Sequence, residues 1–284
     1  MKKLKLYCAF IPAVIFILIL GAQTLPGEAP GANHIAVPLA DPSRPAEVRA
    51  HLLSGSITVK AYDGKEVIVD AKAREDGDEE EPEKKPEGNL HRIPVTSTGL
   101  SIEAEGNIVR IGTDSVRRTV DLTLTVPVHT SLSLKTVNNG NITVTGVDGE
   151  LDVNDINGEV TLNHISGSAV AHALNGRVLA TFSRVNPEKP MAFSSLNGDI
   201  DVTFPPDLKA TVSMRTDNGE VYSDFDIQLQ TTTNQPTVED NRGKGGRYTV
   251  RVDKTVDGNI NGGGQKIQFK NFNGNIYIRK AGAK

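Results

Sequence analysis

Five carboxylates are the side chains best suited to acid–base chemistry in this sequence. Cleavage of a glycan by such groups needs two carboxylates facing each other, or one base beside an Arg or Lys. The candidates are Asp152, Asp155, Glu159, Asp199 and Asp201. Most stand at polar positions of alternating segments, where a carboxylate more often belongs to a solvated surface. We therefore expect no catalytic residue, with a polysaccharide-active enzyme as the alternative.

Histidines and glycines raise the question of a metal site. The six histidines do not recur at one repeat position; they are His34, His51, His91, His129, His164 and His172. A calcium-binding β-roll needs two or three Gly per nine-residue unit and an Asp at a fixed place. Here one Gly recurs per unit, and an aliphatic residue stands where the Asp would fall. The sequence also lacks a nucleophile elbow, a P-loop and a dinucleotide fingerprint, so we expect neither metal nor cofactor.

These side chains lie on a repeat of nine residues. In each unit a Gly is followed, two and four residues later, by aliphatic residues with polar ones between. In the first unit these are Ile142 and Val144. This alternation is typical of a half-buried strand. The residue pair that ends in Gly is typical of a turn, because Asn, Asp and Gly tolerate a positive φ. The repeating glycines are Gly140, Gly149, Gly158, Gly167 and Gly176.

The sequence also has a longer period of about 18 residues. Asn precedes every second repeating Gly, and the Asn-Gly pair returns further along the chain. We infer an all-β solenoid with coils of about 18 to 22 residues and two corners per coil. Coils would stack about 4.8 Å apart, with an aliphatic stack inside and an Asn stack at one corner. The predicted corner residues are Asn139, Gly140, Gly149, Asn157, Gly158, Gly167, Asn175, Gly176, Asn197, Gly198, Asn218, Gly219, Asn273 and Gly274.

Composition agrees with a narrow solenoid. The 284 residues include 27 Gly and no Trp, and aromatic residues make up 5%, so the core is expected to consist of Val, Ile, Leu and Ala. Less regular strands before residue 135 predict an N-terminal β cap. Two polar stretches, 75–88 and 228–246, are expected to be insertions into one elongated domain, 46–284.

The N-terminus has the layout of an export signal. Lys2, Lys3 and Lys5 precede an apolar run that ends at Leu20 and is followed by small residues. We predict a signal peptide over 1–22, or an N-terminal anchor if it is not cleaved, and a Pro/Gly-rich spacer over 23–45. The single Cys lies within the signal. The net charge of −4 argues against nucleic-acid binding.

The repeats resemble the bacterial DUF4097 family, whose members are labelled adhesins. The resemblance rests on a strand closing in Leu124-Thr125-Val126-Pro127, on the Asn-Gly units, and on a last coil from Ile267 to Ile278. It covers roughly Val48 to Lys280. It implies a β-solenoid on an exported or membrane-anchored protein and supplies no catalytic residues.

Together these features predict a non-enzymatic adhesion or binding scaffold of the cell envelope. The protein is expected in the periplasm, at the cell surface or outside the cell. Its partner would be an envelope polysaccharide or a surface protein, with no nucleic acid, and with membrane contact only through an uncleaved N-terminal segment. Besides an envelope polysaccharide-active enzyme, an accessory module of membrane signalling stays open as an alternative.

Overall fold

The computed structural model describes residues 34–74, 98–113, 118–230, 237–240, 248–251 and 254–283. For 237–240 and 248–251 only the backbone is described. Every regular element in these ranges is a β-strand, so the predicted all-β class is confirmed. No helix that could cross a bilayer occurs in the same ranges. The predicted signal segment, 1–22, and the acidic stretch, 75–88, lie outside them.

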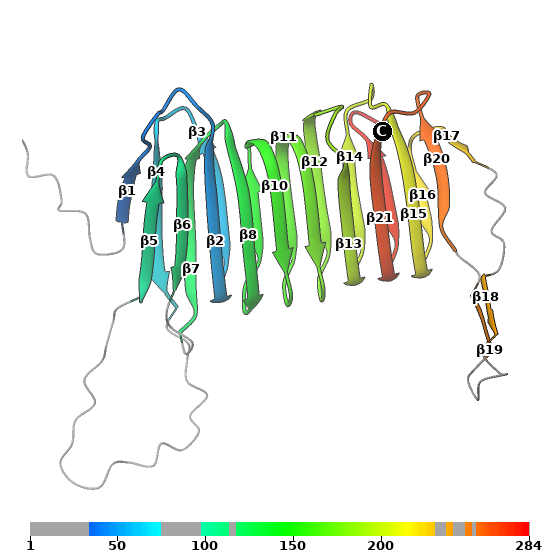
Figure 1. The fold of residues 1–284 in the computed structure, drawn as a ribbon, viewed down its shortest axis with the longest axis horizontal. Coiled ribbons are helices and arrows are strands. Elements are labelled where there is room, and N and C mark those ends of the chain that lie inside the picture. The colour runs from blue at the N-terminus through cyan, green and yellow to red at the C-terminus, as the bar shows by residue number, and fades with distance from the viewer. Residues whose placement is uncertain are drawn as a thin grey trace, which may run out of the picture. The chain divides into compact units, whose positions relative to one another are not determined.

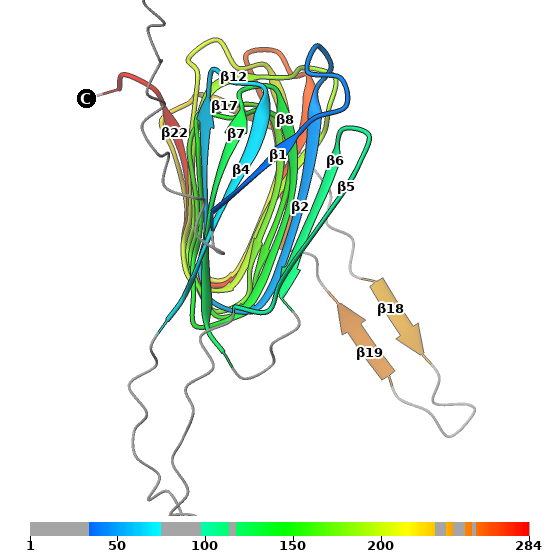
Figure 2. The same cartoon turned by 90° about the vertical axis from the view of Figure 1, so that its left-hand side faces the viewer.

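The main sheet folds into two facing layers of strands (Figures 1 and 2). Within each layer the ladders are mostly parallel. The front face runs, in spatial order, through β5 (Leu100–Glu105), β6 (Ile108–Thr113), β2 (Ala46–Ser54), β8 (Thr130–Asn138), β10 (Asp148–Asp155), the second half of β11 (Val160–Ala173), β13 (Met191–Asn197), β21 (Gln265–Asn273), β15 (Ala210–Asn218) and β20 (Val256–Ile260).

The back face is built the same way. It runs through β1 (His34–Pro38), β4 (Glu66–Ala73), β7 (Val120–Pro127), β3 (Ile57–Tyr62), β9 (Ile142–Thr145), the first half of β11, β12 (Val178–Val185), β14 (Ile200–Phe204), β22 (Ile276–Lys280) and β16 (Val221–Ser223). At the C-terminal end β17 (Ile227–Leu229) pairs with β20. A separate hairpin joins β18 (Thr237–Asp240) and β19 (Tyr248–Arg251).

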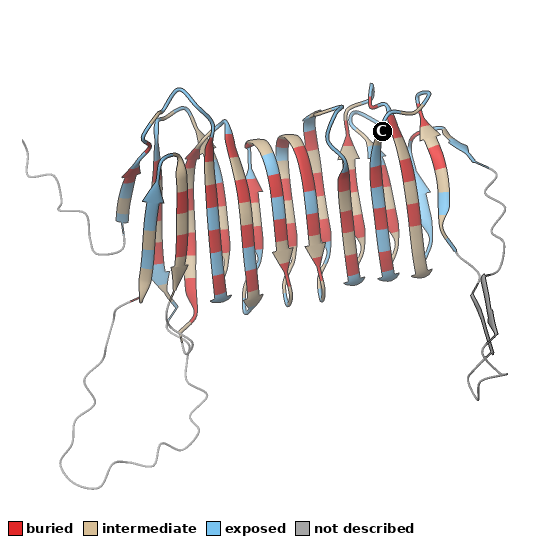
Figure 3. Ribbon diagram, viewed as in Figure 1, coloured by how far each residue is buried: buried red, intermediate tan, exposed pale blue. Residues whose placement is uncertain are grey.

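Burial follows the pattern of the sequence, as the alternating bands of Figure 3 show. In β7 every second residue is buried, beginning with Val120. Equivalent positions stack from coil to coil, so that Ile142 pairs with Val160 and Val160 with Val178. All three side chains are fully buried. The predicted aliphatic stack therefore forms the core of most of the solenoid.

Phenylalanine fills the core of the C-terminal half, contrary to the expectation of a purely aliphatic interior. Phe193 and Phe269 on the front face stack with centroids 5.5 Å apart, and Phe182 and Phe204 on the back face stack at 5.2 Å. Edge contacts join the two pairs; that of Phe182 with Phe193 is 6.1 Å long. The aromatic residues are few, but four of them are concentrated at one place in the core.

The spatial order of the coils differs from the order of the sequence at both ends of the stack. The early coil β2–β3 lies between β6–β7 and β8–β9. The last coil, β21–β22, lies between β13–β14 and β15–β16. Antiparallel strands then close the ends, with β5 and β1–β4 at one end and β20 at the other. The less regular N-terminal cap is confirmed in this form.

Two segment boundaries need correction. Within the expected spacer, His34–Pro38 forms a strand that pairs with β4, because the side chain of Val37 is buried against the core. Within the expected insertion 228–246, β17 includes Gln228 and Leu229, and β18 covers Thr237–Asp240. The remainder of that insertion, apart from Gln230, lies outside the described residues.

Candidate functional site

One row of asparagines runs along the edge where each front strand turns into its back strand. From the second member of the row onward, each side-chain amide donates to the side-chain oxygen of the Asn before it at 2.8 or 2.9 Å. Adjacent coils are offset by 18 residues between Asn157 and Asn175, and by 22 between Asn175 and Asn197. In spatial order the row is Asn138, Asn157, Asn175, Asn197, Asn273 and Asn218.

Asn139, the predicted corner residue, is not in this row. Its neighbour Asn138 takes the position, and Asn139 instead donates to the hydroxyl of Ser54 at 3.1 Å. The corner here holds one more residue than the corner at Asn157-Gly158. Asn139 accommodates the extra residue in the left-handed conformation, with φ of 58°.

Beside the asparagines lies a row of glycines whose backbones touch. A Cβ on Gly158 would lie 1.9 Å from the carbonyl oxygen of Gly140, and one on Gly176 would lie 2.0 Å from that of Gly158. Gly198, Gly274 and Gly219 continue the row, and Gly55 begins it. Gly149 and Gly167 lie in contact with each other at the opposite corner. The corner residues therefore hold the coils at strand spacing, and they present no reactive group.

The five candidate carboxylates do not converge. Asp152 and Asp155 lie on the front strand β10, the first exposed and the second fully buried. The other three are bound to neighbours: Glu159 pairs with Arg177 at 2.7 Å, Asp199 accepts from the backbone N–H of Asn275 at 2.7 Å, and Asp201 pairs with Arg279 at 2.7 Å.

The histidines are likewise dispersed. His34 pairs with Asp70 on the back face, and His129 lies 3.2 Å from Asp148. His172 shares a hydrogen bond of 2.8 Å with the Ser194 hydroxyl, and burial lowers the pKa of His172. The described part of the chain holds no group of three His, Cys, Asp or Glu side chains that could bind a metal. His91 lies outside it.

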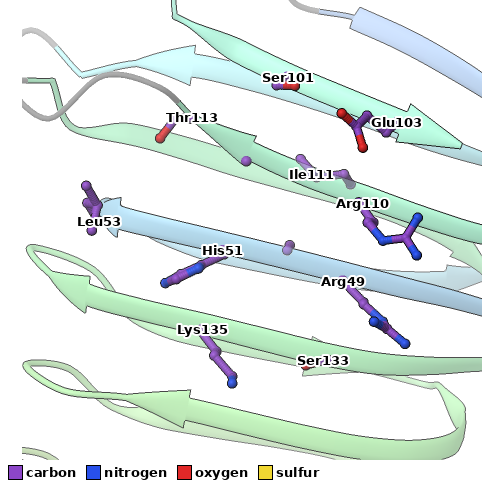
Figure 4. A pocket seen from close by; sticks show the side chains of 12 residues that line it. Arg49, His51, Leu53, Ser101, Glu103, Arg110, Ile111, Thr113, Ser133 and Lys135 are labelled. Atoms are coloured by element: carbon purple, nitrogen blue, oxygen red, sulfur yellow. The ribbon is translucent and has the colours of Figure 1, made fainter.

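A groove of about 680 Å³ is the candidate site that the sequence did not reveal (Figure 4). It lies on the front face across β5, β6, β2 and β8. Its charged and polar lining consists of Arg49, His51, Ser101, Glu103, Arg110, Thr113, Ser133 and Lys135. These residues come from distant parts of the sequence, and they meet because β2 lies between β6 and β8.

Basic side chains dominate this groove. Arg49 donates to Glu47 at 2.6 Å, and Arg110 lies 3.6 Å from Glu105, whose side chain is 85% exposed. Surface pairs of this kind contribute little and leave the cations accessible. Lys135 is exposed, and Figure 4 shows its side chain extending from β8 below that of His51. The groove can therefore attract an anion.

The family comparison agrees with this architecture. Residues 121–261 match the model of the family described as Toastrack DUF4097. The chain carries a Toastrack DUF4097 domain. The match begins in β7 and ends just after β20, so the inserted last coil of the Toastrack solenoid follows the matched residues in sequence. The resemblance inferred from the Asn-Gly units is confirmed.

Two solved structures are similar to the Toastrack chain. One is described as a "putative cell adhesion protein" from Clostridium sporogenes ATCC 15579, with 8% identity, a TM-score of 0.36, and coverage of 87% of this chain and 99% of the other. The second is described as a "putative adhesin" from Bacteroides fragilis NCTC 9343, with 11% identity, a TM-score of 0.38, and coverage of 88% and 98%. No curated protein matches the chain.

Proposed function

We propose that this protein is a non-enzymatic binding scaffold of the cell envelope, exported by its N-terminal segment, that attaches to an envelope or surface polymer. The observation that supports this most is the basic groove on an otherwise regular, hydrogen-bonded stack. A solenoid offers an extended surface of fixed side chains, which suits a long partner better than a small substrate.

The placement of the carboxylates also favours binding over catalysis. Acid–base cleavage of a glycan needs two carboxyl groups, or a base and a cation, facing the same bond of a bound substrate. Glu159 and Asp201 each lie beside an arginine, Arg177 and Arg279, but these ion pairs join adjacent coils and lie outside the groove. Asp155 is buried away from any substrate.

The experiment uses the full chain with a C-terminal tag, expressed in a bacterium. Fractionation followed by N-terminal sequencing tests export, and the expected result is an envelope or extracellular protein that starts after residue 22. The purified protein is then incubated with envelope fractions and recovered through the tag. We expect co-purification of an envelope polymer that is chemically unchanged.

Two results would contradict the proposal. A protein found only in the cytoplasm would contradict export. New reducing or unsaturated ends on the polymer would show the alternative, a polysaccharide-active enzyme. Recovery in the membrane fraction with residue 1 retained would instead favour an anchored signalling module.

A further inference from the structure

We propose that the groove on β5, β6, β2 and β8 binds the carboxylate groups of an acidic polysaccharide. This inference rests on the proposed binding function and names its ligand class and its site.

The basic residues of the groove are neighbours across parallel strands. Arg49 pairs in register with Arg110 of β6, and His51 pairs with Lys135 of β8. Paired strands lie about 4.8 Å apart, and residues two apart along one strand about 6.6 Å. The four side chains therefore occupy two adjacent rows on one surface. An extended ligand can contact both rows at once.

Two arginines directly opposite each other cost stability, because like charges repel across a strand pair. The ion-pair partners of the two arginines, Glu47 and Glu105, are solvated and offset this cost only in part, and Glu103 stands opposite Arg110 in register. A bound anion would relieve the repulsion. The chain as a whole carries a net charge of −4, so this basic surface is a local departure from the rest.

Donor geometry favours carboxylate as the anion. The planar guanidinium fork of Arg matches a carboxylate with two parallel hydrogen bonds. Arg49 uses its Nε toward Glu47, which leaves its terminal nitrogens for a ligand. Arg110 contacts Glu105 through one terminal nitrogen at 3.6 Å, beyond hydrogen-bond length.

Glu103 indicates why the anion should be carried by a sugar. It lines the groove and pairs in register with Arg110. A carboxylate there repels a densely charged chain such as polyphosphate, but it accepts hydrogen bonds from neutral hydroxyl groups. The hydroxyls of Ser101 and Ser133 add donors and acceptors of the same kind. A polymer with alternating carboxylates and hydroxyls satisfies both sets of side chains.

The test measures binding of the full-length protein to polygalacturonate by calorimetry at low and at moderate salt. Matched ligands are methyl-esterified pectin, in which the carboxylates are blocked, neutral dextran, and polyphosphate. We expect polygalacturonate to bind, with affinity falling as salt rises. Esterified pectin and dextran should bind at least about tenfold more weakly. Tighter binding of polyphosphate than of polygalacturonate would overturn the ligand class.

The variants separate the groove from general charge effects. Arg49→Gln combined with Arg110→Gln should reduce the affinity for polygalacturonate at least about tenfold, because two charge-assisted contacts are lost. The control pairs Arg177→Gln with Arg279→Gln: it removes the same charge from ion-paired, exposed arginines of the back face. Its affinity should stay within about twofold of the parent.

A further variant, Lys135→Gln, changes one exposed side chain of the front face and should reduce both affinity and salt dependence. The proposed site would be overturned if the double arginine variant and the lysine variant both bound polygalacturonate as tightly as the parent. It would also be overturned if the back-face control lost as much affinity as the double arginine variant. Circular dichroism and thermal midpoints establish that each variant is folded. Capture of envelope polymer by the double arginine variant, with no polygalacturonate binding by the parent, would reject this ligand and keep the proposed function.

Discussion

The hydroxyl of Ser195 donates a hydrogen bond of 2.9 Å to the carbonyl oxygen of Gly176 in the adjacent coil. Ser195 stands two residues before a member of the asparagine row. Residues at the same position in other coils do the same: Thr136 donates to Gly55, Asn271 to Gly198 and Thr216 to Gly274, each at 2.9 Å. A donor at this position therefore satisfies a glycine carbonyl of the next coil.

Asp155 occupies this position in its own coil, where an ionised carboxylate has no hydrogen to donate. A Cβ on Gly158 would lie 1.9 Å from the Gly140 carbonyl oxygen and 2.7 Å from Oδ2 of Asp155, so both oxygens face the same point. Neither carboxyl oxygen has a hydrogen-bond partner among the described residues. Burial raises the pKa of Asp155 to about 7. The nearby backbone N–H of Asn157 has a smaller, opposite effect and lowers this pKa.

Stability should therefore depend on the protonation of Asp155. Its pKa is about 7 in the folded protein and near the ordinary 3.8 when unfolded, so the folded state binds more protons between these values. The contribution of Asp155 is greatest below pH 4 and is lost as the pH rises through 7. The loss is on the order of 4 kcal/mol, since each unit is worth about 1.4 kcal/mol. The measurement compares variants, so that the pH dependence of the rest of the chain cancels.

Asp155→Asn supplies the missing donor in the same shape, as Asn271 does in its coil. At pH 8 we expect this variant to be more stable than the parent in urea unfolding, and at pH 4 the difference should disappear. Asp152→Asn is the matched control, because Asp152 lies on the same strand and is exposed. An Asp155→Asn variant less stable than the parent at pH 8 would show that the carboxyl is ionised and held by a favourable contact.

The asparagine row predicts a second difference. Asn175→Ala removes two side-chain hydrogen bonds, one to Asn157 and one from Asn197, whereas Asn218→Ala at the end of the row removes one. At about 0.5–1.5 kcal/mol per bond, the central substitution should destabilise by about twice as much. Thermal unfolding of both variants checks this. Asn154→Ala, in the same solenoid but outside the row, is the control and should change the thermal midpoint least. Equal losses of stability in all three variants would contradict the prediction.

The sequence sufficed to predict the strands and the coil length, because alternation and Asn-Gly spacing are local signals. It did not suffice for the order of the coils. The coil β13–β14 stacks on β21–β22, although β15–β16 follows it in the chain. Repeats with the same pattern of apolar residues can pair equally well, so local patterns do not decide which coil is the neighbour.

The same limit applies to the candidate site. Arg49 and Arg110 are isolated basic residues in alternating strands, and only the pairing of β2 with β6 brings them together. Asn138 and Asn139 are both suitable for the asparagine row by type. The choice depends on the left-handed backbone of Asn139, which spacing alone does not reveal.

The phenylalanine cluster predicts a large local contribution to stability. Phe193 is fully buried and contacts Phe182, Phe204 and Phe269. Phe193→Ala should cost about 3–5 kcal/mol, because the cavity cannot close between two hydrogen-bonded faces. Phe272→Ala is the control; this residue is 45% exposed, and the cost should be below about 1 kcal/mol. Denaturant unfolding measures both, and equal costs would contradict the clustering argument.

The glycine row predicts the most severe substitution. Gly158→Ala places a methyl group 1.9 Å from the carbonyl oxygen of Gly140, and that carbonyl cannot retreat without separating two coils. We expect at least about 3 kcal/mol of destabilisation, or failure to fold. Gly112→Ala is the control, because its Cβ would meet only the His51 carbonyl oxygen at 3.9 Å. Alanine there should be tolerated within about 1 kcal/mol, since a strand gains from losing glycine's backbone freedom. If expression and thermal midpoint are alike for the two variants, the close approach of the glycine backbones does not limit the stacking of the coils.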